Sequence, residues 1–305
     1  MRYYQMSKSL IDKYGVKTYK LPLHLEGTCP NRDGTIAKGG CSFCAEGAMD
    51  FELLDAKLPI AVQLEKNMAY IGKRYGAKAF IAYFQNYSAT YRPIEELLWM
   101  MKQCLIDGIV EISLSTRPDC IPTPMLRELK KFSDRYAVEV TLELGVQCLN
   151  DEVLKNMGRG HDARTSLDAM KRIKGAGLNL GVHCILNYPA MERGDVIDLA
   201  KACSEIGANR VKLHSLYIEK GTRLGDDYLK EKFELCGYEE YLERVLLFLG
   251  YLNKDIALER FFARAPQETT LFCNWSRSWR YLMEELEILM DNRDFEQGQC
   301  RRNHV

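Results

Sequence analysis

The stretch CPNRDGTIAKGGCSFC, residues 29–44, contains three of the eleven cysteines of the chain. Eleven residues separate Cys29 from Cys41, and two separate Cys41 from Cys44. Three thiols in one Gly-rich loop are typical of a metal site, but a closed tetrahedral zinc site needs four ligands. The spacing therefore raises the question of what a site with three protein ligands would bind.

Three interpretations of these cysteines are open on spacing alone. In the first they belong to a zinc site whose fourth ligand is His24, five residues before Cys29. In the second they are reduced structural cysteines, because a CxxC pair by itself is not diagnostic. In the third they bind a four-iron cluster, whose irons take cysteine thiolates, and three cysteines would leave one iron open for catalysis.

Short apolar runs alternate with longer amphipathic segments around this loop. Strands are expected at 18–25, 78–84, 108–115, 137–146, 178–186 and 209–217. Helices are expected between them at about 60–75, 93–107, 122–135, 162–176 and 192–207. This order indicates a parallel sheet covered by helices, either doubly wound or closed toward a barrel. In both folds chemistry belongs at the carboxyl ends of the strands, and the cysteine loop follows the first strand.

Helical periodicity replaces the strand pattern after about residue 225, which predicts a mainly helical C-terminal extension over 225–305. This extension has a basic and aromatic interval that comprises Arg260, Arg264, Trp275, Arg277, Trp279 and Arg280. Arginine and aromatic side chains can stack a splayed-out RNA base. An ordinary helical cap with solvated charges is the alternative interpretation of the same residues.

The overall charge gives no preference for a polyanionic partner, because Lys plus Arg and Asp plus Glu both total 42. The N-terminus lacks an apolar run of signal-peptide type, and no segment approaches the roughly 20 apolar residues that span a bilayer. We therefore expect a cytoplasmic protein without a membrane partner. Free cysteines are the rule in a reducing compartment, where clustered thiols more often bind metal than form disulfides.

With Phe43 inside the last CxxC, the loop resembles the cluster loop of the radical SAM superfamily. The resemblance continues through YKLPLHLEGTCPNRDGT, AYFQNYSATYRP, SLSTRPDCIP, LELGVQCLNDEVLKNMGRGH and VKLHSLYIEKGTRL. These motifs are most similar to the elongator-type and coproporphyrinogen-oxidase-like group, in its YhcC/YtqA-type bacterial branch. The resemblance implies an α/β fold, a partial (β/α)6 TIM-like barrel over 1–224 with a cluster loop at 26–47, and a helical C-terminal extension over 225–305.

The resemblance also implies the cofactors. Cys29, Cys41 and Cys44 would hold a 4Fe-4S cluster, and S-adenosylmethionine (SAM) would occupy the fourth iron through its amino and carboxylate groups. Reductive cleavage of SAM would give a 5′-deoxyadenosyl radical that abstracts a hydrogen atom from the substrate. The electron would come from a donor such as flavodoxin or ferredoxin.

The first cofactor-binding residues implied by the resemblance surround the cluster loop and the next two strands. Phe43 lies in the loop itself. The turn after the second strand, which binds the SAM amino group and is often Gly-rich in this superfamily, reads FQNYS here, so Gln85 and Asn86 are expected in its place. Ser115 and Arg117, at the end of the third strand, are expected near SAM.

Further contacts are implied along the fourth and fifth strands. Gln147 would contact the SAM ribose, and Arg159, twelve residues later, would bind the SAM carboxylate. Glu143 would be a second ribose or substrate acceptor, or else a buried partner of a base. An acid that the coproporphyrinogen-oxidase-like branch uses on the fifth strand matches Cys184, whereas His183 and His214 are expected to be structural.

The resemblance points to tRNA as the substrate. Elongator-type relatives act on the wobble uridine of tRNA but carry an acetyltransferase domain, for which this chain is too short. The YtqA-type branch instead suggests conversion of 5-carboxymethylaminomethyluridine toward 5-aminomethyluridine, with the anticodon loop of tRNA as partner. Two alternatives are a radical SAM enzyme for a small metabolite or cofactor precursor, and a non-enzymatic, zinc-bound RNA-binding scaffold.

Overall fold

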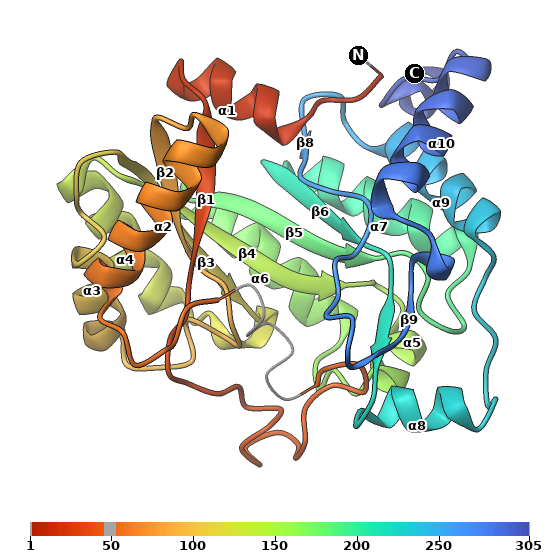
Figure 1. The fold of residues 1–305 in the computed structure, drawn as a ribbon, viewed down its shortest axis with the longest axis horizontal. Coiled ribbons are helices and arrows are strands. Elements are labelled where there is room, and N and C mark those ends of the chain that lie inside the picture. The colour runs from red at the N-terminus through yellow and green to blue at the C-terminus, as the bar shows by residue number, and fades with distance from the viewer. Residues whose placement is uncertain (1, 46–52, 305) are drawn as a thin grey trace.

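The computed structural model describes residues 2–45 and 53–304, so positions 46 and 47 of the expected cluster loop lie outside the described residues. Its centre is a parallel sheet with the strand order β1-β2-β3-β4-β5-β6-β8 (Figure 1). These strands are β1 (Thr18–Leu23), β2 (Ala79–Phe84), β3 (Ile109–Thr116), β4 (Glu139–Gln147), β5 (Asn179–Ile185), β6 (Arg210–His214) and β8 (Ala257–Leu258).

The spatial order of the strands follows their order in the chain. A doubly wound sheet would reverse direction at a switch point, whereas successive right-handed βα steps that keep adding on one side curl the sheet toward a barrel. The partial barrel is therefore confirmed, and it is extended by one short strand beyond the six expected.

Helices cover the outer face of this half-barrel (Figure 1). The connecting helices are α2 (Ile60–Tyr75), α3 (Ile94–Lys102), α4 (Thr123–Tyr136), α5 (Asp151–Asn156), α6 (Ala163–Gly175) and α7 (Arg193–Ile206). On β4 the residues that face them are Val140, Leu142, Leu144 and Val146, all buried. The alternate positions of the strand are polar or small, so the interior of the half-barrel receives side chains of a different kind.

The amino-terminal end of the barrel is closed by α1 (Met6–Tyr14), at the top of Figure 1. Met6 and Leu10 pack against Ile81 on β2 and Ala257 on β8. The Tyr14 hydroxyl donates a 3.0 Å hydrogen bond to Glu111 inside the barrel. The interior is therefore approached from the carboxyl ends of the strands, at the bottom of the same view.

The C-terminal segment contains α8 (Arg223–Leu229), α9 (Tyr238–Tyr251) and α10 (Trp279–Asn292). Two short strands lie where no strand was expected: β8 in the main sheet, and β9 (Thr270–Cys273), antiparallel to β7 (Tyr217–Glu219). Strands of two and four residues are too short to show a period of two. The expected boundary between 224 and 225 falls inside α8, and the division into two domains stays a prediction. Within the described ranges no helix is long and apolar enough to cross a membrane.

Candidate functional site

Charged side chains fill the interior of the half-barrel. Glu143 on β4 accepts hydrogen bonds from Lys20 and from Arg210 and pairs with His183 Nε2 at 2.9 Å. Burial opposes ionisation of Glu143, but the charges of Lys20 and Arg210 outweigh it and hold the pKa of this carboxyl well below its usual range. Both carboxylate oxygens therefore have basic partners, which is the second of the two roles expected for Glu143.

The same network reaches the far edge of the sheet. Glu259, next to β8, forms ion pairs with Lys20 on β1 and, at 3.1 Å, with Lys212 on β6. Burial raises the pKa of Glu259, but Lys20 and Lys212 outweigh that effect and lower the pKa to about 2. The Glu259 carboxylate is therefore ionised. Through its ion pair with Lys20 it connects β8 at one open edge of the half-barrel to β1 at the other.

A cavity of about 170 Å³ lies at the carboxyl ends of the strands. Four of the expected cofactor-binding residues line one flank: Phe43, Gln85, Ser115 and Gln147. The other flank is basic and is formed by His183, Lys212, His214, Arg260 and Arg264. The structure thus brings residues from β2, β3 and β4 together with residues from β5, β6 and the C-terminal segment.

Gln147 reaches the cavity because the end of β4 is irregular. The pairing of β4 with β5 shifts between Gly145 and Gln147, and Gln147 has a left-handed φ of 69°. A Cβ on Gly145 would lie 3.0 Å from Gln147 Nε2 and 3.2 Å from Arg159 Nη2. Glycine at position 145 therefore allows these two expected SAM contacts to approach each other.

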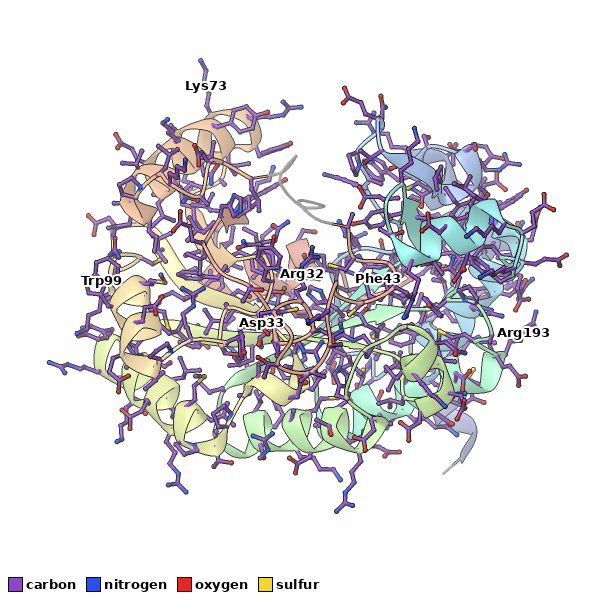
Figure 2. The ribbon with its side chains drawn as sticks, turned by 90° about the horizontal axis from the view of Figure 1, so that it is seen from below. Arg32, Asp33, Phe43, Lys73, Trp99 and Arg193 are labelled. Atoms are coloured by element: carbon purple, nitrogen blue, oxygen red, sulfur yellow. The ribbon has the colours of Figure 1, made fainter. Side chains whose placement is uncertain are left out.

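The cysteine loop crosses the open end of the barrel, where Figure 2 shows Arg32 and Phe43 inside the arc of helices. Arg159 Nη1 donates to Cys41 Sγ at 3.2 Å, and Arg32 Nη1 donates to Cys44 Sγ at 3.4 Å. Burial raises the pKa of the Cys41 thiol, but the charge and hydrogen bond of Arg159 outweigh it, so this pKa is lowered. Burial and the neighbouring Cys41 raise the pKa of Cys44 to about 11.

The donors around this loop suit a thiolate-bound cofactor. Cys29 is half-buried, Cys41 is buried, and all three cysteines are free thiols. Two buried polar atoms beside them, Asn31 Oδ1 and Arg159 Nε, have no hydrogen-bond partner within the described part of the chain. Cysteine binds iron as the thiolate, which nearby guanidinium groups favour. Three thiols with adjacent arginines and unsatisfied polar atoms therefore fit an iron-sulfur cluster.

No group of three His, Cys, Asp or Glu side chains that could hold a metal ion is formed by residues 2–45 and 53–301. His24, the fourth ligand in the zinc interpretation, is turned toward another group, because its Nδ1 lies 2.9 Å from the Leu54 carbonyl oxygen and must donate to it. This contact anchors the end of β1 to the segment before α2.

Three other expected residues make contacts that organise the rim of the barrel. Asn86 donates to the carbonyl oxygen of Leu25 at 2.7 Å and accepts from its N–H at 3.1 Å. Arg117 binds both carboxylate oxygens of Asp119 and donates to the Arg159 carbonyl oxygen at 2.7 Å. Arg159 itself spans Cys41 and the Gly145 carbonyl oxygen, so it connects the cysteine loop to the end of β4.

The fifth strand differs from the expectation. Cys184, the position matched to an acid, is buried against Cys203 on α7 and does not line the cavity. His183 and Ile185 line it instead. Strand alternation could have predicted this difference. Leu180, Val182 and Cys184 form the apolar face of the strand, whereas Gly181 and His183 lie on the opposite face.

A basic and aromatic surface continues from the cavity. Arg264 lines the cavity and lies 5.1 Å from the centre of the Trp279 ring, which Arg280 approaches at 5.3 Å. Arg277 lies over Tyr238 at 4.3 Å and over Tyr281 at 5.0 Å. We call these six residues the Arg–Trp surface. Trp275 is not part of it, because its Nε1 donates to the Cys236 carbonyl oxygen at 2.7 Å.

Comparison of this sequence with known protein families and proteins indicates a single family. Residues 31–203 match the sequence model of the Radical SAM superfamily, and residues 208–290 match the Radical_SAM C-terminal domain. The chain is 31% identical to the protein YhcC of Escherichia coli (strain K12) over 90% of this chain and 88% of that protein. It is 28% identical to the uncharacterized protein YtqA of Bacillus subtilis (strain 168) over 97% of this chain and 92% of that protein.

Two further similarities are more distant. A tRNA uridine(34) acetyltransferase of Methanocaldococcus infernus is 27% identical over 50% of this chain and 28% of that protein. The solved structure of the archaeal Methanocaldococcus infernus Elp3 with an N-terminal deletion superposes with a TM-score of 0.69 at 17% identity. That match covers 92% of this chain and 64% of the other, and it shows a shared fold.

Proposed function

The chain belongs to the radical SAM superfamily, in the group of YhcC and YtqA, and we propose that Cys29, Cys41 and Cys44 hold its cluster. Members of this superfamily use a 4Fe-4S cluster and SAM, so the chain is a radical SAM enzyme. The contact of Arg159 with Cys41 supports the assignment, because it lowers the pKa of this thiol, and Arg32 opposes the rise in pKa that burial causes at Cys44.

The cluster and SAM, when bound, supply a 5′-deoxyadenosyl radical that removes a hydrogen atom from the substrate. The chain's own residues position SAM. Arg159 offers a guanidinium to the SAM carboxylate, and Gln147, at the bulge of β4, offers a side-chain amide to the ribose. Ser115 and Gln85 complete the polar lining of this flank, and Phe43 covers the cavity from the cysteine loop.

We propose tRNA as the substrate, with the wobble uridine as its modified base. The observation that carries this proposal is the Arg–Trp surface, which shares Arg264 with the cavity. Stacked aromatic rings and guanidinium planes suit single-stranded loops, whose bases can be splayed out into a pocket. Trp279 and Tyr281 are 38% and 39% exposed, so both side chains can be reached from solvent together with the arginines that lie over them. The similarity to a tRNA uridine(34) acetyltransferase supports the same substrate.

The reaction that we propose starts from 5-carboxymethylaminomethyluridine and leads toward 5-aminomethyluridine. A hydrogen atom is removed from the carbon beside the carboxylate, loss of one further electron to a one-electron acceptor gives an imine, and addition of water releases glyoxylate and leaves the primary amine. The substituent of the starting nucleoside is small enough to enter the cavity while the rest of the anticodon loop stays outside. Hydrogen abstraction from a carbon of this substituent requires only that the carbon lie near SAM, and the polar flank provides that position.

A first experiment tests the cofactor. The protein is purified without oxygen, and its iron, zinc and acid-labile sulfide are measured before SAM and a chemical reductant are added. We expect a brown protein that releases 5′-deoxyadenosine. A colourless protein with one zinc ion per chain would reject the enzyme assignment and leave the zinc scaffold.

A second experiment tests the substrate. Nucleosides from the tRNA of a deletion strain are analysed by mass spectrometry, with the wild-type gene and a Cys41→Ala variant returned as matched controls. We expect 5-carboxymethylaminomethyluridine to accumulate in the deletion strain and with the variant, and to fall with the wild-type gene. An unchanged wobble-uridine profile in all strains would direct the search to small metabolites.

A further inference from the structure

The charges of the barrel interior are unequal on the basic flank of the cavity. Five basic side chains stand against three carboxylates: Lys20, Arg210, Lys212, Arg260 and Arg264 against Glu111, Glu143 and Glu259. Arg210 pairs with two of these carboxylates, and the two lysines share the third. The excess of positive charge lies with Arg260 and Arg264, and of these two Arg264 lies against the Trp279 ring at the outer surface.

Arg260 has no carboxylate within ion-pair distance among the described residues. One nitrogen, Nη2, donates to His214 Nδ1 at 2.7 Å, whereas Nε is buried and has no hydrogen-bond partner in this part of the chain. Burying a charged donor without an acceptor is costly, so such a group is expected to find its partner in a ligand. The guanidinium lines the cavity, where a ligand can reach it.

The neighbours of Arg260 strengthen the preference for an anion. His214 and His183 stand side by side with ring centres 5.3 Å apart, and Lys212 lies on the same strand as His214. Burial and the charge of Arg260 hold the pKa of His214 well below its usual range, so this ring is neutral and accepts from Arg260. The one carboxylate on this flank, Glu259, is already shared by two lysines.

We propose that the Arg260 end of the cavity is a carboxylate-binding subsite, which takes the carboxylate of the 5-carboxymethylaminomethyl group. This inference rests on the proposed function, because it identifies the part of the substrate that this flank receives. Arginine binds carboxylates with two parallel N–H···O bonds, and on Arg260 the Nε–H and the second N–H of Nη2 lie on one edge of the guanidinium and are suited to this. The expected product keeps a protonated amine but has lost the carboxylate, so the basic flank no longer attracts it and the subsite also favours product release.

The substrate carboxylate proposed for Arg260 and the SAM carboxylate proposed for Arg159 would bind at different places. Arg159, the residue proposed for SAM, lies against Cys41 and the end of β4, and the cavity lining does not include it. Arg260 follows β8 and adjoins β6, at the other end of the strand order. A substrate held at Arg260 would extend across the cavity toward the SAM flank, which places the carbon beside the carboxylate near the middle.

Binding of two anticodon stem-loop RNAs to the anaerobic holoenzyme tests this subsite. One RNA has 5-carboxymethylaminomethyluridine at the wobble position, and the other has 5-aminomethyluridine. The variant is Arg260→Gln, which keeps a donor and leaves no carboxylate unpaired. The matched control is Arg280→Gln, which removes an arginine of the Arg–Trp surface outside the cavity lining. SAM binding by equilibrium dialysis is measured for both variants.

We expect the wild type to bind the carboxylate-bearing RNA about 10- to 100-fold more tightly than the amine, the range of a charge-assisted hydrogen bond. Arg260→Gln should remove this preference, and Arg280→Gln should weaken the binding of both RNAs by the same factor. An Arg260→Gln variant that keeps the preference, or one that loses SAM binding instead, would overturn the proposal.

Failure of the proposed function gives a different result, in which the wild type binds neither RNA. The affinities of benzoate and benzamide for the wild type and for Arg260→Gln are then measured by titration to test the subsite. Tighter binding of benzoate that Arg260→Gln abolishes would support a carboxylate subsite for another substrate. Equal affinities for the two probes, or a preference that the variant keeps, would overturn it.

Discussion

At the scale of single residues, Arg159 connects the cysteine loop to the end of β4, the two parts of the proposed cofactor site. Its guanidinium donates to Cys41 in the cysteine loop and to the Gly145 carbonyl oxygen at the end of β4, while Nε has no partner among the described residues. A planar fork can make these contacts together, and a single ammonium cannot reproduce them. The geometry agrees with a role in which Arg159 holds an anionic group of SAM beside the cluster loop.

Arg159→Ala is expected to keep the cluster and to weaken SAM binding by about 10- to 100-fold, because one or more charge-assisted hydrogen bonds are lost. Iron and sulfide content report the cluster, and equilibrium dialysis reports SAM binding. Arg164→Ala is the matched control, since Arg164 is exposed at the start of α6. Full SAM affinity in Arg159→Ala would show that the carboxylate binds elsewhere.

Replacement of Cys29, Cys41 or Cys44 by alanine is expected to abolish cluster assembly in each case, because the loss of one of three thiolates opens a second iron. The measurement is iron content and visible absorbance after anaerobic reconstitution. Cys236→Ala is the control, because Cys236 lies in the loop before α9 and outside the cavity lining. If one of these three variants keeps a full cluster, the cysteine that it replaces is not a ligand.

Some residues of the site were predictable and others were not. Ser115 and Gln147 follow from strand alternation and from the resemblance, and both line the cavity. The same alternation could have placed His183 in the cavity. Instead, the acid of the coproporphyrinogen-oxidase-like branch was matched to Cys184, one position further along the strand. Arg260 was recognised only as part of the basic and aromatic interval. Its place in the cavity could not be predicted, because it follows a two-residue strand whose pairing with β6 only the tertiary structure reveals.

At the scale of elements, close approach between neighbouring strands determines how the interior is filled. Gly181 on β5 lies beside Glu143 on β4 and Arg210 on β6. A Cβ at this position would lie 2.9 Å from Glu143 Cγ and 3.4 Å from Arg210 Cγ. Glycine therefore creates the space in which the central ion pair of the network fits.

Gly181→Ala is expected to reduce the free energy of unfolding by about 1–3 kcal/mol, because the added methyl group overpacks a buried charged contact. Gly194→Ala is the matched control, since a Cβ there meets no atom within 4 Å. In that helical position alanine should be neutral or stabilising by up to about 1 kcal/mol. Equal effects in denaturant titration would mean that Gly181 has no packing role.

The regular elements were predictable because they are long and periodic. α2 has the expected bounds, and the six expected strands agree with the structure to within a few residues, apart from the last, which divides into β6 and β7. The expected helix at 93–107 ends earlier, at Lys102, and turns lead from there into β3. β8 and β9 were missed because pairing with distant segments defines them, as in the hydrogen bond from Ala257 N–H beside β6 to the Asn209 carbonyl oxygen.

At the scale of the whole molecule, one buried charge network extends across the open side of the half-barrel. Lys20 on the first strand binds both Glu143 and Glu259, and Glu259 follows the last strand of the sheet. A half-barrel lacks the hydrogen bonds that would join its edge strands, and these ion pairs connect the edges instead. The network also surrounds His183 and His214, whose environment makes the fold sensitive to pH.

The two histidines predict a loss of stability below neutral pH. Burial lowers the pKa of His183 although Glu143 opposes the shift, and burial with Arg260, His183 and Lys212 lowers that of His214. The unfolded chain, with histidine pKa values near 6.5, therefore binds protons that the folded chain does not. Stability that is full above this pH is lost as the pH falls through it.

Burial also lowers the pKa of His161, to about 3, so it adds to the effect of the two cavity histidines. We expect the holoenzyme to lose about 2–4 kcal/mol of unfolding free energy between pH 7.5 and 5.5, with His214 contributing about 1.4 kcal/mol of that loss. His214→Gln is the informative variant, because glutamine still accepts from Arg260 but cannot take a proton in the unfolded state. Anaerobic denaturant titrations at several pH values should give a shallower pH dependence for the variant. Since the cluster is common to both proteins, their difference isolates the histidine, and identical slopes would contradict the neutral, buried imidazole on which the basic flank of the cavity depends.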